Sequence, residues 1–295
     1  MGFIGYESWQ KQFINGTFCP ARISIPMNDV AAYQICNEEY KWVYNKLKLY
    51  EVSKIVAHPT GIMPDAYPVF VKPITNLFGM GIHSRKIDNE EEYLKSYHGG
   101  ELWMPVFNGE HVSTDVAVIN GSVNWVVHSK GYKNEKNHEE WDYWEILDYE
   151  ILQVSSVITD WIAEHLKSYS GMLNFETIGE NIIEVHLRFS SQFIDLYPRD
   201  FLDNVVSLYH KKPIWKCSNP TEKGYSVPIF YHNQITDFHL PSKRDSITSI
   251  QNTSSDEGNV PQKKKRLAII NCKNLQDGIS YRNEVLSNLN YTSNI

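Results

Sequence analysis

The middle of the chain consists of short runs in which hydrophobic and polar residues alternate, the pattern typical of half-buried β-strands. Two of these runs meet at Asn120-Gly121, a dipeptide typical of a tight hairpin turn. A second hairpin is predicted from GMLNFETIG followed by NIIEVHLRF. The predicted strands lie at 67–73, 81–87, 100–107, 111–129, 171–179 and 181–189.

Apolar residues at helical spacing predict helices between these strands. We expect helical structure over about 29–50 and 88–97, a long amphipathic helix over 144–168 that ends before Gly171, and another over 200–210. The polar stretch 242–266, which includes KKKR, predicts a flexible loop, and RLAIINC after it predicts a buried strand followed by a helix ending near Leu289. This order of elements predicts an α+β fold.

Composition narrows the function classes. The 295 residues carry a net charge of -7, which disfavours binding to nucleic acid or to an anionic membrane surface. The four cysteines form no CxxC pair, and no apolar run is long enough to span a bilayer. These features predict a cytoplasmic protein without a zinc site, although the segment KKKR leaves a polyanion patch open.

The hairpin 172–189 carries the most informative side chains. Alternation gives it one apolar face and one polar face, and the polar face holds Asn174, Glu176, Glu184, His186 and Arg188. With the turn centred on Glu180, Glu176 lies across from Glu184 and Asn174 across from His186. Two opposed carboxylates destabilise a hairpin unless a cation lies between them, so the pattern favours a magnesium site. A solvent-facing charged surface is the alternative.

A second candidate site is the strand 68–72, which ends at Lys72 and leads into a loop with Gly79 and Gly81. Glycines let backbone amides approach phosphates, and a lysine at a strand end supplies positive charge. The loop is not a Walker A motif, because GKS and GKT are absent. By itself this segment also fits a hairpin with a surface lysine.

The order of these pieces resembles the ATP-grasp superfamily over about half of the chain. The most specific part is the last hairpin, where Gly171, Asn174 and Glu176 precede the run Ile183-Glu184-Val185-His186-Leu187-Arg188. The resemblance implies two α+β subdomains with the nucleotide between them. It divides the chain into a reduced N-terminal segment (1–65), a core of a small subdomain (66–106) and a large one (107–215), and a C-terminal extension (216–295).

The resemblance also implies roles for individual residues. Lys72 and Arg188 would contact phosphates as catalytic groups, and Lys46 resembles a second nucleotide-binding lysine. Glu176, Glu184 and His186 match the metal-ligand positions, with His186 replacing the usual asparagine, so that His186 is alternatively a contact for phosphate or substrate. The remaining nucleotide contacts would come from a flap and from the linker between subdomains, namely Gly79, Met80 and Gly81, and Trp103, Met104, Pro105 and Val106. Asp115 matches the acidic position that opens the large subdomain. The simpler interpretation is that Asp115 has a structural role.

The implied reaction is ATP- and Mg²⁺-dependent activation of a carboxylate as an acylphosphate, which an amine or a thiol then attacks. The substrates would be small molecules or peptides, near His128, Lys130 and the loop 130–142. The alternative interpretation of His128 is a surface residue at the end of a strand. The alternatives are an ATP-grasp phosphotransferase and an ATP-grasp-like protein that binds nucleotide without turnover. The sequence leaves the oligomeric state open.

Overall fold

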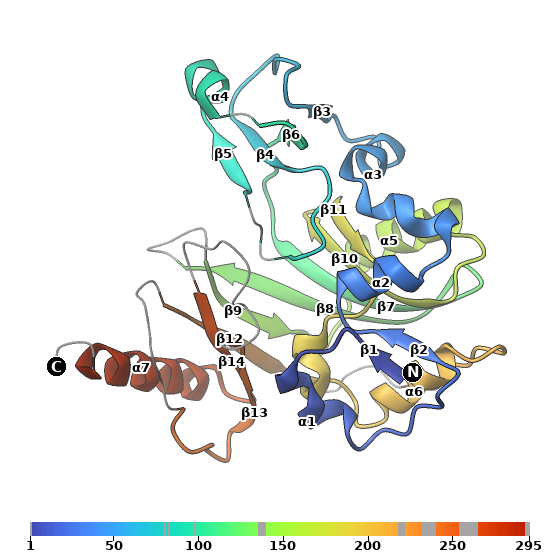
Figure 1. The fold of residues 1–295 in the computed structure, drawn as a ribbon, viewed down its shortest axis with the longest axis vertical. Helices are drawn as coiled ribbons and strands as arrows, with labels where there is room; N and C mark the ends of the chain where they lie inside the picture. The colour runs from blue at the N-terminus through green and yellow to red at the C-terminus, as the bar shows by residue number, and fades with distance from the viewer. Residues whose placement is uncertain are drawn as a thin grey trace.

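The computed structural model describes residues 2–79, 81, 83–96, 98–134, 140–217, 222–231, 240–253 and 265–292. Within them lie one large antiparallel sheet, one four-stranded sheet and one two-stranded sheet, with helices packed beside them (Figure 1). The small sheet stands at the top of the view, and the C-terminal helix extends at the lower left. No helix in these ranges has the length and apolar character that crossing a membrane requires.

The large sheet has eight strands in the order β11-β10-β7-β8-β9-β12-β14-β13. Its first half contains β7 (His111–Ile119), β8 (Ser122–Lys133), β9 (Trp141–Ile146), β10 (Gly171–Ile178) and β11 (Asn181–His186). Strands β12 (Gly224–Tyr231), β13 (Ile247–Asn252) and β14 (Lys265–Cys272) extend it on the β9 side. The C-terminal segment therefore continues the sheet of the core.

The small sheet has the order β3-β6-β4-β5. It consists of β3 (His58–Pro59), β4 (Val69–Pro73), β5 (Arg85–Ile87) and β6 (Glu101–Pro105), with helix α4 (Glu90–Ser96) between the last two in sequence. Its own small core is formed by Val69, Val71, Ile87, Tyr93 and Trp103. Strand β6 leads directly toward β7, so residues 106–110 connect the two sheets.

The N-terminal segment contributes a two-stranded parallel sheet and a series of short helices. The strands are β1 (Gly2–Ile4) and β2 (Ser24–Pro26). The helices are η1 (Ser8–Gln10), α1 (Lys11–Ile14), α2 (Asp29–Ile35), η2 (Glu38–Tyr44) and α3 (Lys46–Val52). Asn28 caps α2 and Asn45 caps α3 through their side-chain oxygens, which fixes where both helices begin.

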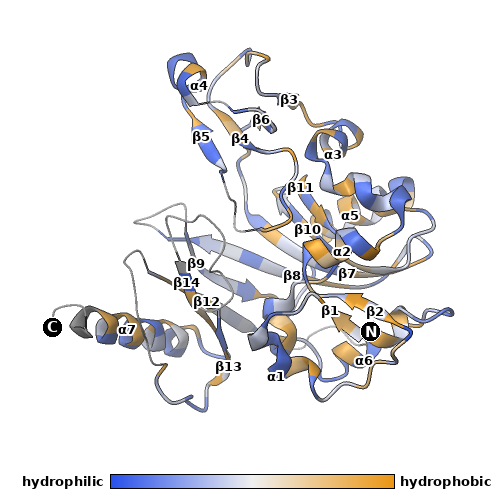
Figure 2. Cartoon of the chain, in the orientation of Figure 1, coloured by the Kyte–Doolittle hydropathy of each residue, from blue (hydrophilic) through white to orange (hydrophobic). Residues whose placement is uncertain are grey.

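Both faces of the large sheet are covered. On one face Val116, Val118 and Leu173 pack with α5 (Leu152–His165), η2 and α3. On the other face Ala117 and Met172 pack with the N-terminal segment, η3 (Ser191–Leu196) and α6 (Phe201–Leu208). Helix α7 (Leu275–Thr292) covers β12 and β14, and its exposed side is polar (Figure 2).

Both predicted hairpins and the α+β class are confirmed. In the turn between β7 and β8, Asn120 and Gly121 have φ of 49° and 74°, the left-handed conformation that this dipeptide favours. In the second hairpin Glu176 pairs with Glu184 and Asn174 with His186, as expected. The buried strand at 266–272 and the helix after it are also present.

Two secondary-structure predictions were wrong over part of their length, and a third, helical one is interrupted; residues 254–264 of the predicted loop lie outside the described residues. The predicted helix 144–168 starts only at Leu152, because Trp144 and Ile146 belong to β9 and pack into the core. The predicted loop 242–266 contains β13, whose buried positions are Ile247, Ser249 and Gln251. The helical stretch 29–50 is broken into α2, η2 and α3.

Candidate functional site

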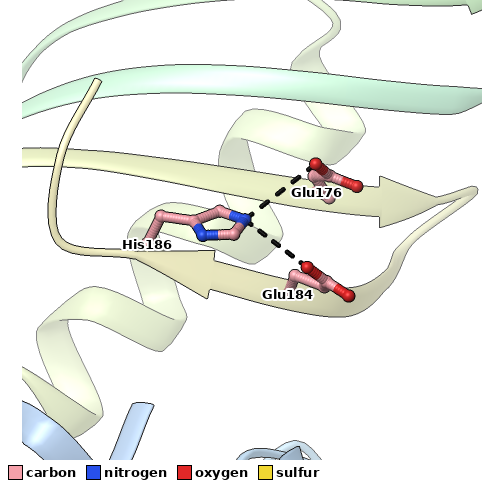
Figure 3. A group of neighbouring side chains, drawn as sticks. All are labelled: Glu176, Glu184 and His186. Carbon is pink, nitrogen blue, oxygen red and sulfur yellow. Dashed lines mark ion pairs between the residues drawn. The ribbon is translucent and has the colours of Figure 1, made fainter. Parts of the chain in front are cut away.

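Two glutamates face each other at the centre of the candidate site. Glu176 on β10 is the direct partner of Glu184 on β11, and His186 on β11 lies beside both (Figure 3). One ligand atom from each of these residues lies within 4.8 Å of the others. Gly179, with φ of 57°, lies in the turn between the two strands. The alternation of side chains along each strand then brings Glu176, Glu184 and His186 to one face of the hairpin.

Each of these three side chains has one polar atom held by a neighbour and one that turns toward the cluster. Glu176 Oε2 contacts His111 Nε2 at 3.1 Å, and Glu184 Oε1 lies 3.5 Å from both Lys46 Nζ and Lys72 Nζ. The other carboxylate oxygens, Glu176 Oε1 and Glu184 Oε2, lie 3.9 and 3.6 Å from His186 Nε2. His186 Nε2 is buried and has no hydrogen-bond partner among the described residues.

These three atoms form a plausible donor set for a divalent cation. Two carboxylate oxygens suit magnesium or manganese, and an imidazole nitrogen is a common ligand of transition metals. A buried polar atom without a partner costs free energy, so a cation or a water at His186 Nε2 would stabilise this arrangement. The residues therefore fit a cation, and the three roles predicted from sequence fall on side chains that the fold brings together.

Two buried lysines, one on α3 and one on β4, approach the same cluster. Lys46 opens α3 and Lys72 lies on β4, and their side chains are 5% and 3% exposed. Lys72 Nζ donates a hydrogen bond of 3.1 Å to the Ile183 carbonyl and lies over the ring of Tyr50 at 5.4 Å. Glu184 thus receives two ammonium groups from elements that are far apart in sequence.

Arg188 joins the site through a residue that the sequence reading missed. Asp29, the first residue of α2, accepts a hydrogen bond of 2.8 Å from Arg188 Nη2 and one of 3.0 Å from His186 Nδ1. Tyr44 Oη donates to the same carboxylate at 3.3 Å. Asp29 is only 4% exposed. No sequence motif distinguishes Asp29, and His111 was missed for the same reason.

The charges of the cluster stabilise one another. Burial opposes ionisation of Glu176, but its hydrogen bond to His111 and that residue's charge lower its pKa to about 2. Burial likewise opposes ionisation of Glu184 and Asp29, yet the pKa of Glu184 is lowered by Lys46 and Lys72, and that of Asp29 by Arg188 and His186. For Lys72 burial prevails over the neighbouring glutamates, so its pKa is lowered. The carboxylates are therefore ionised at neutral pH.

Two hollows adjoin the cluster. A void of about 10 Å³, bounded by Lys46, Asn76, Glu184 and His186, has room for roughly one water-sized sphere. A larger pocket of about 160 Å³ lies next to Arg188 and Asp29. Its walls come from four parts of the chain: the N-terminal segment, residues 77–79, residues 190–192 after β11, and strand β14.

The predicted flap lies beside this larger pocket. Gly79 and Gly81 have φ of 69° and 59°, a conformation that glycine adopts without steric cost. Asn76 holds the loop through a hydrogen bond of 2.9 Å from its Nδ2 to the Gly79 carbonyl. Leu77, Phe78 and Gly79 line the pocket, whereas Met80 lies outside the described residues.

The predicted adenine linker falls on β6 and the residue after it. Trp103 and Met104 are buried, and Trp103 Nε1 donates to the Ile62 carbonyl at 2.7 Å. The Trp103 side chain thus belongs to the core of the small sheet. Pro105 is exposed and Val106 is half-buried at the start of the connection between sheets.

Two other candidate residues have structural positions. Asp115 is fully buried and accepts hydrogen bonds from Tyr197 Oη, Asn174 Nδ2 and the Ser190 backbone amide. These contacts agree with a structural role for Asp115. The expectation of a substrate-binding or surface His128 was wrong. His128 is 1% exposed and hydrogen-bonded to Thr114 and Ser155, and burial lowers its pKa to about 4.

The other part of the predicted substrate region also differs from expectation. Strands β8 and β9 extend into the predicted loop 130–142, because Tyr132 stacks on Tyr143 and the two strands remain paired as far as Lys133 and Trp141. Lys130 pairs with Glu110. The pocket beside Arg188 lies elsewhere, under the N-terminal segment.

No protein-family model matches the sequence, and no curated protein matches it at a significant level. Solved structures match it over most of its length. The L-amino acid ligase of Bacillus licheniformis is 12% identical with a TM-score of 0.60, and the match covers 95% of this chain and 82% of that one. The phosphoribosylamine–glycine ligase of Thermotoga maritima is 13% identical with a TM-score of 0.61, covering 96% and 85%.

A third match is bound to nucleotide. The biotin carboxylase domain of the Hydrogenobacter thermophilus 2-oxoglutarate carboxylase, in complex with MgADP, ADP and bicarbonate, is 14% identical with a TM-score of 0.58. The match covers 84% of this chain and 66% of that one. At such low identity these likenesses establish the fold that the chains share.

Proposed function

Since this chain has the ATP-grasp fold, we propose that it is an ATP- and Mg²⁺-dependent ligase that activates a carboxylate as an acylphosphate for attack by an amine or a thiol. One observation carries the proposal. Lys46 and Lys72 lie against Glu184 in a partly buried cluster of two ionised glutamates and His186, and Arg188 is linked to the same cluster through Asp29, although these residues come from separate elements or turns of the chain.

Phosphoryl transfer asks a protein mainly to position its reactants and to neutralise charge. A cation held by Glu176, Glu184 and His186 would neutralise phosphate oxygens and orient the transferred group. Lys46 and Lys72 are placed to contact the phosphates with their ammonium groups. Because both lysines already lie against Glu184, nucleotide phosphates would share these ammonium groups with the carboxylate.

The remainder of the nucleotide would lie between the two sheets. Backbone groups of residues 103–106 would meet the adenine, in the connection that leads from β6 to β7. The glycine loop 79–81 would close over the phosphates. This assignment uses backbone atoms at the linker, since the Trp103 side chain is held in the small core.

The pocket beside Arg188 is the best place for the acceptor. Its volume of about 160 Å³ is close to that of cavities that hold a benzene-sized molecule, which favours a small carboxylate or the end of a longer one. Arg188 Nη1 and Nη2 are donors to Phe189 and Asp29, and a guanidinium has further N–H groups that suit a carboxylate or a phosphate. The amine would then approach through the same hollow.

The alternatives with the same nucleotide site are a phosphotransferase and a protein that binds ATP without turnover. The replacement of an amide by His186 is the observation that favours the second of these, because magnesium prefers oxygen ligands to nitrogen. A phosphotransferase would pass phosphate to an acceptor that keeps it, whereas a ligase releases phosphate only when the amine is also present.

Trapping with hydroxylamine tests the proposal. Small carboxylates, amino acids included, would be incubated with the protein, ATP, a divalent cation and hydroxylamine as a general amine. The ligase proposal predicts ATP-dependent formation of a hydroxamate together with equal amounts of ADP and phosphate. A stable phosphorylated acceptor would favour the phosphotransferase, and ATP binding with neither product across the panel would favour the non-catalytic protein.

A further inference from the structure

The histidine of the cation cluster is held in a defined orientation by Asp29. His186 Nδ1 donates to Asp29 Oδ1 at 3.0 Å, and each residue is 4% exposed. A carboxylate can only accept this hydrogen bond, so the proton lies on Nδ1 when the ring is neutral. The lone pair of Nε2 then points toward Glu176 Oε1 and Glu184 Oε2 (Figure 3).

Asp29 is itself fixed in place. Arg188 Nη2 donates to its second oxygen, Oδ2, at 2.8 Å, and Tyr44 Oη donates to Oδ1 at 3.3 Å. A carboxylate, an imidazole and a metal in line form an arrangement that orients the ring and increases its basicity toward the metal. The same buried contacts keep the His186 ring from turning away from the two glutamates.

Resting on the proposed function, we propose that the Asp29–His186 pair makes this site selective for manganese over magnesium. Glu176 and Glu184 supply two oxygens, and the phosphates of ATP would supply others, so most of the ligands suit either ion. The ligand that distinguishes manganese from magnesium is the imidazole nitrogen of His186. Magnesium binds oxygen almost exclusively, whereas a first-row transition ion accepts imidazole, and Mn²⁺ is the one that also suits an oxygen-rich set.

The Nε2 atom is the observation that distinguishes this proposal from a plain acidic cluster. It is buried, has no hydrogen-bond partner among the described residues, and lies 3.9 and 3.6 Å from the nearer oxygens of Glu176 and Glu184. The competing explanation is an imidazolium that bridges three carboxylates, from Asp29, Glu176 and Glu184. In that state Nε2 would carry a proton and would not bind a metal.

Direct spectroscopy of the wild-type protein separates the two explanations. Mn²⁺ would be added to the full chain with a non-hydrolysable ATP analogue, and electron spin-echo modulation would be recorded. A nitrogen bound to manganese produces modulation from its nuclear spin, so the proposal predicts an imidazole nitrogen signal. The signal is lost in H186N and kept in H210N, a substitution at a partly exposed histidine beyond the end of α6. A wild-type spectrum without nitrogen coupling overturns the proposal.

Calorimetry supplies the second readout. For the wild type we expect Mn²⁺ to support binding of the ATP analogue with a dissociation constant at least about tenfold lower than Mg²⁺ does. H186N should bring the two constants close together, and D29N, which weakens the orienting hydrogen bond, should raise the Mn²⁺ constant about tenfold. Equal constants for both ions in the wild type contradict the selectivity and leave ATP binding intact. No binding with either ion contradicts the proposed function as well.

Discussion

Asp29 and Arg188 form an ion pair of 2.8 Å across 159 positions of sequence, and both side chains are largely shielded from solvent. The pair connects the first residue of α2 to the end of the hairpin that carries the glutamates. The N-terminal segment therefore reaches the candidate site and forms part of the pocket beside Arg188.

Both glutamates of the cluster should contribute to ATP affinity and to stability, through different partners. E176Q removes a carboxylate that lies against His111 and His186, whereas E184Q leaves Lys46 and Lys72 without their shared carboxylate. We expect both variants to lose metal-dependent ATP affinity by about tenfold or more, and each to lose about 2 kcal/mol of unfolding free energy at neutral pH, because the fold lowers the pKa of both carboxyls. Isothermal calorimetry and urea unfolding measure the two effects. Wild-type stability of either variant would contradict the charge pairing that we describe for its glutamate.

Arg188 should not be replaceable by lysine. Its guanidinium donates to Asp29 and to the Phe189 carbonyl from different nitrogens, a fork that a lysine ammonium cannot reproduce. R188K should therefore lower the rate of hydroxamate formation at least about tenfold. R199K, at an arginine outside the cluster, is the matched control and should keep the wild-type rate. An active R188K would remove the role that we assign to Arg188.

His128 should make stability depend on pH. Burial lowers its pKa from 6.5 to about 4, so as the pH falls below 6.5 the unfolded chain takes up the proton first. Stability that is fully present at pH 7 is then lost between pH 6.5 and 4, by about 2 kcal/mol between pH 7 and 5. Urea unfolding of wild type and H128N at several pH values measures this slope. A wild-type slope equal to that of H128N would refute the assignment.

Glu176 should affect the pH dependence of stability at a lower pH than His128 does. Its pKa of about 2, against 4.5 for an ordinary glutamate, means that its contribution to stability is present above pH 4.5 and is lost as the pH falls toward 2. E176Q should flatten the decline in stability below pH 4.5 and leave the decline between pH 6.5 and 5 unchanged. Acid titration followed by circular dichroism distinguishes the two windows.

Gly121 should tolerate no side chain. Its φ is +74°, and a Cβ there would lie 2.5 Å from the Lys167 carbonyl oxygen. G121A should therefore cost about 2 kcal/mol or more in unfolding free energy. At Gly16 a Cβ meets nothing within 4 Å, so G16A is the control and should change stability by less than about 1 kcal/mol. Similar stability of the two variants would refute the turn geometry.

The sequence predicted the hairpins well because local rules decide them. Asn120-Gly121 specifies the turn type, and strict alternation in 172–189 sets which residues share a face, so the Glu176–Glu184 pairing followed from the sequence. The candidate site residues on these strands could be brought together from the sequence for the same reason, with help from the spacing that resembles ATP-grasp enzymes.

The rest could not be predicted from local patterns because it depends on tertiary contacts. Asp29 looks like an ordinary helix-start residue, and only the fold brings it to His186 and Arg188. Trp144 and Ile146 fit a helical period as well as a strand, and pairing with β8 decides for the strand. In β13 the buried Ser249 and Gln251 are polar, which made the segment look like a loop.

The measurement that tests the account most directly is calorimetric titration of the protein with a non-hydrolysable ATP analogue, in the absence of metal and with Mg²⁺ or Mn²⁺. Binding that requires a divalent cation, and that weakens about tenfold or more in E176Q, is the result that we predict. Absence of binding at millimolar nucleotide with either ion would contradict the claim that the cluster around Glu176, Glu184 and His186 is a nucleotide site.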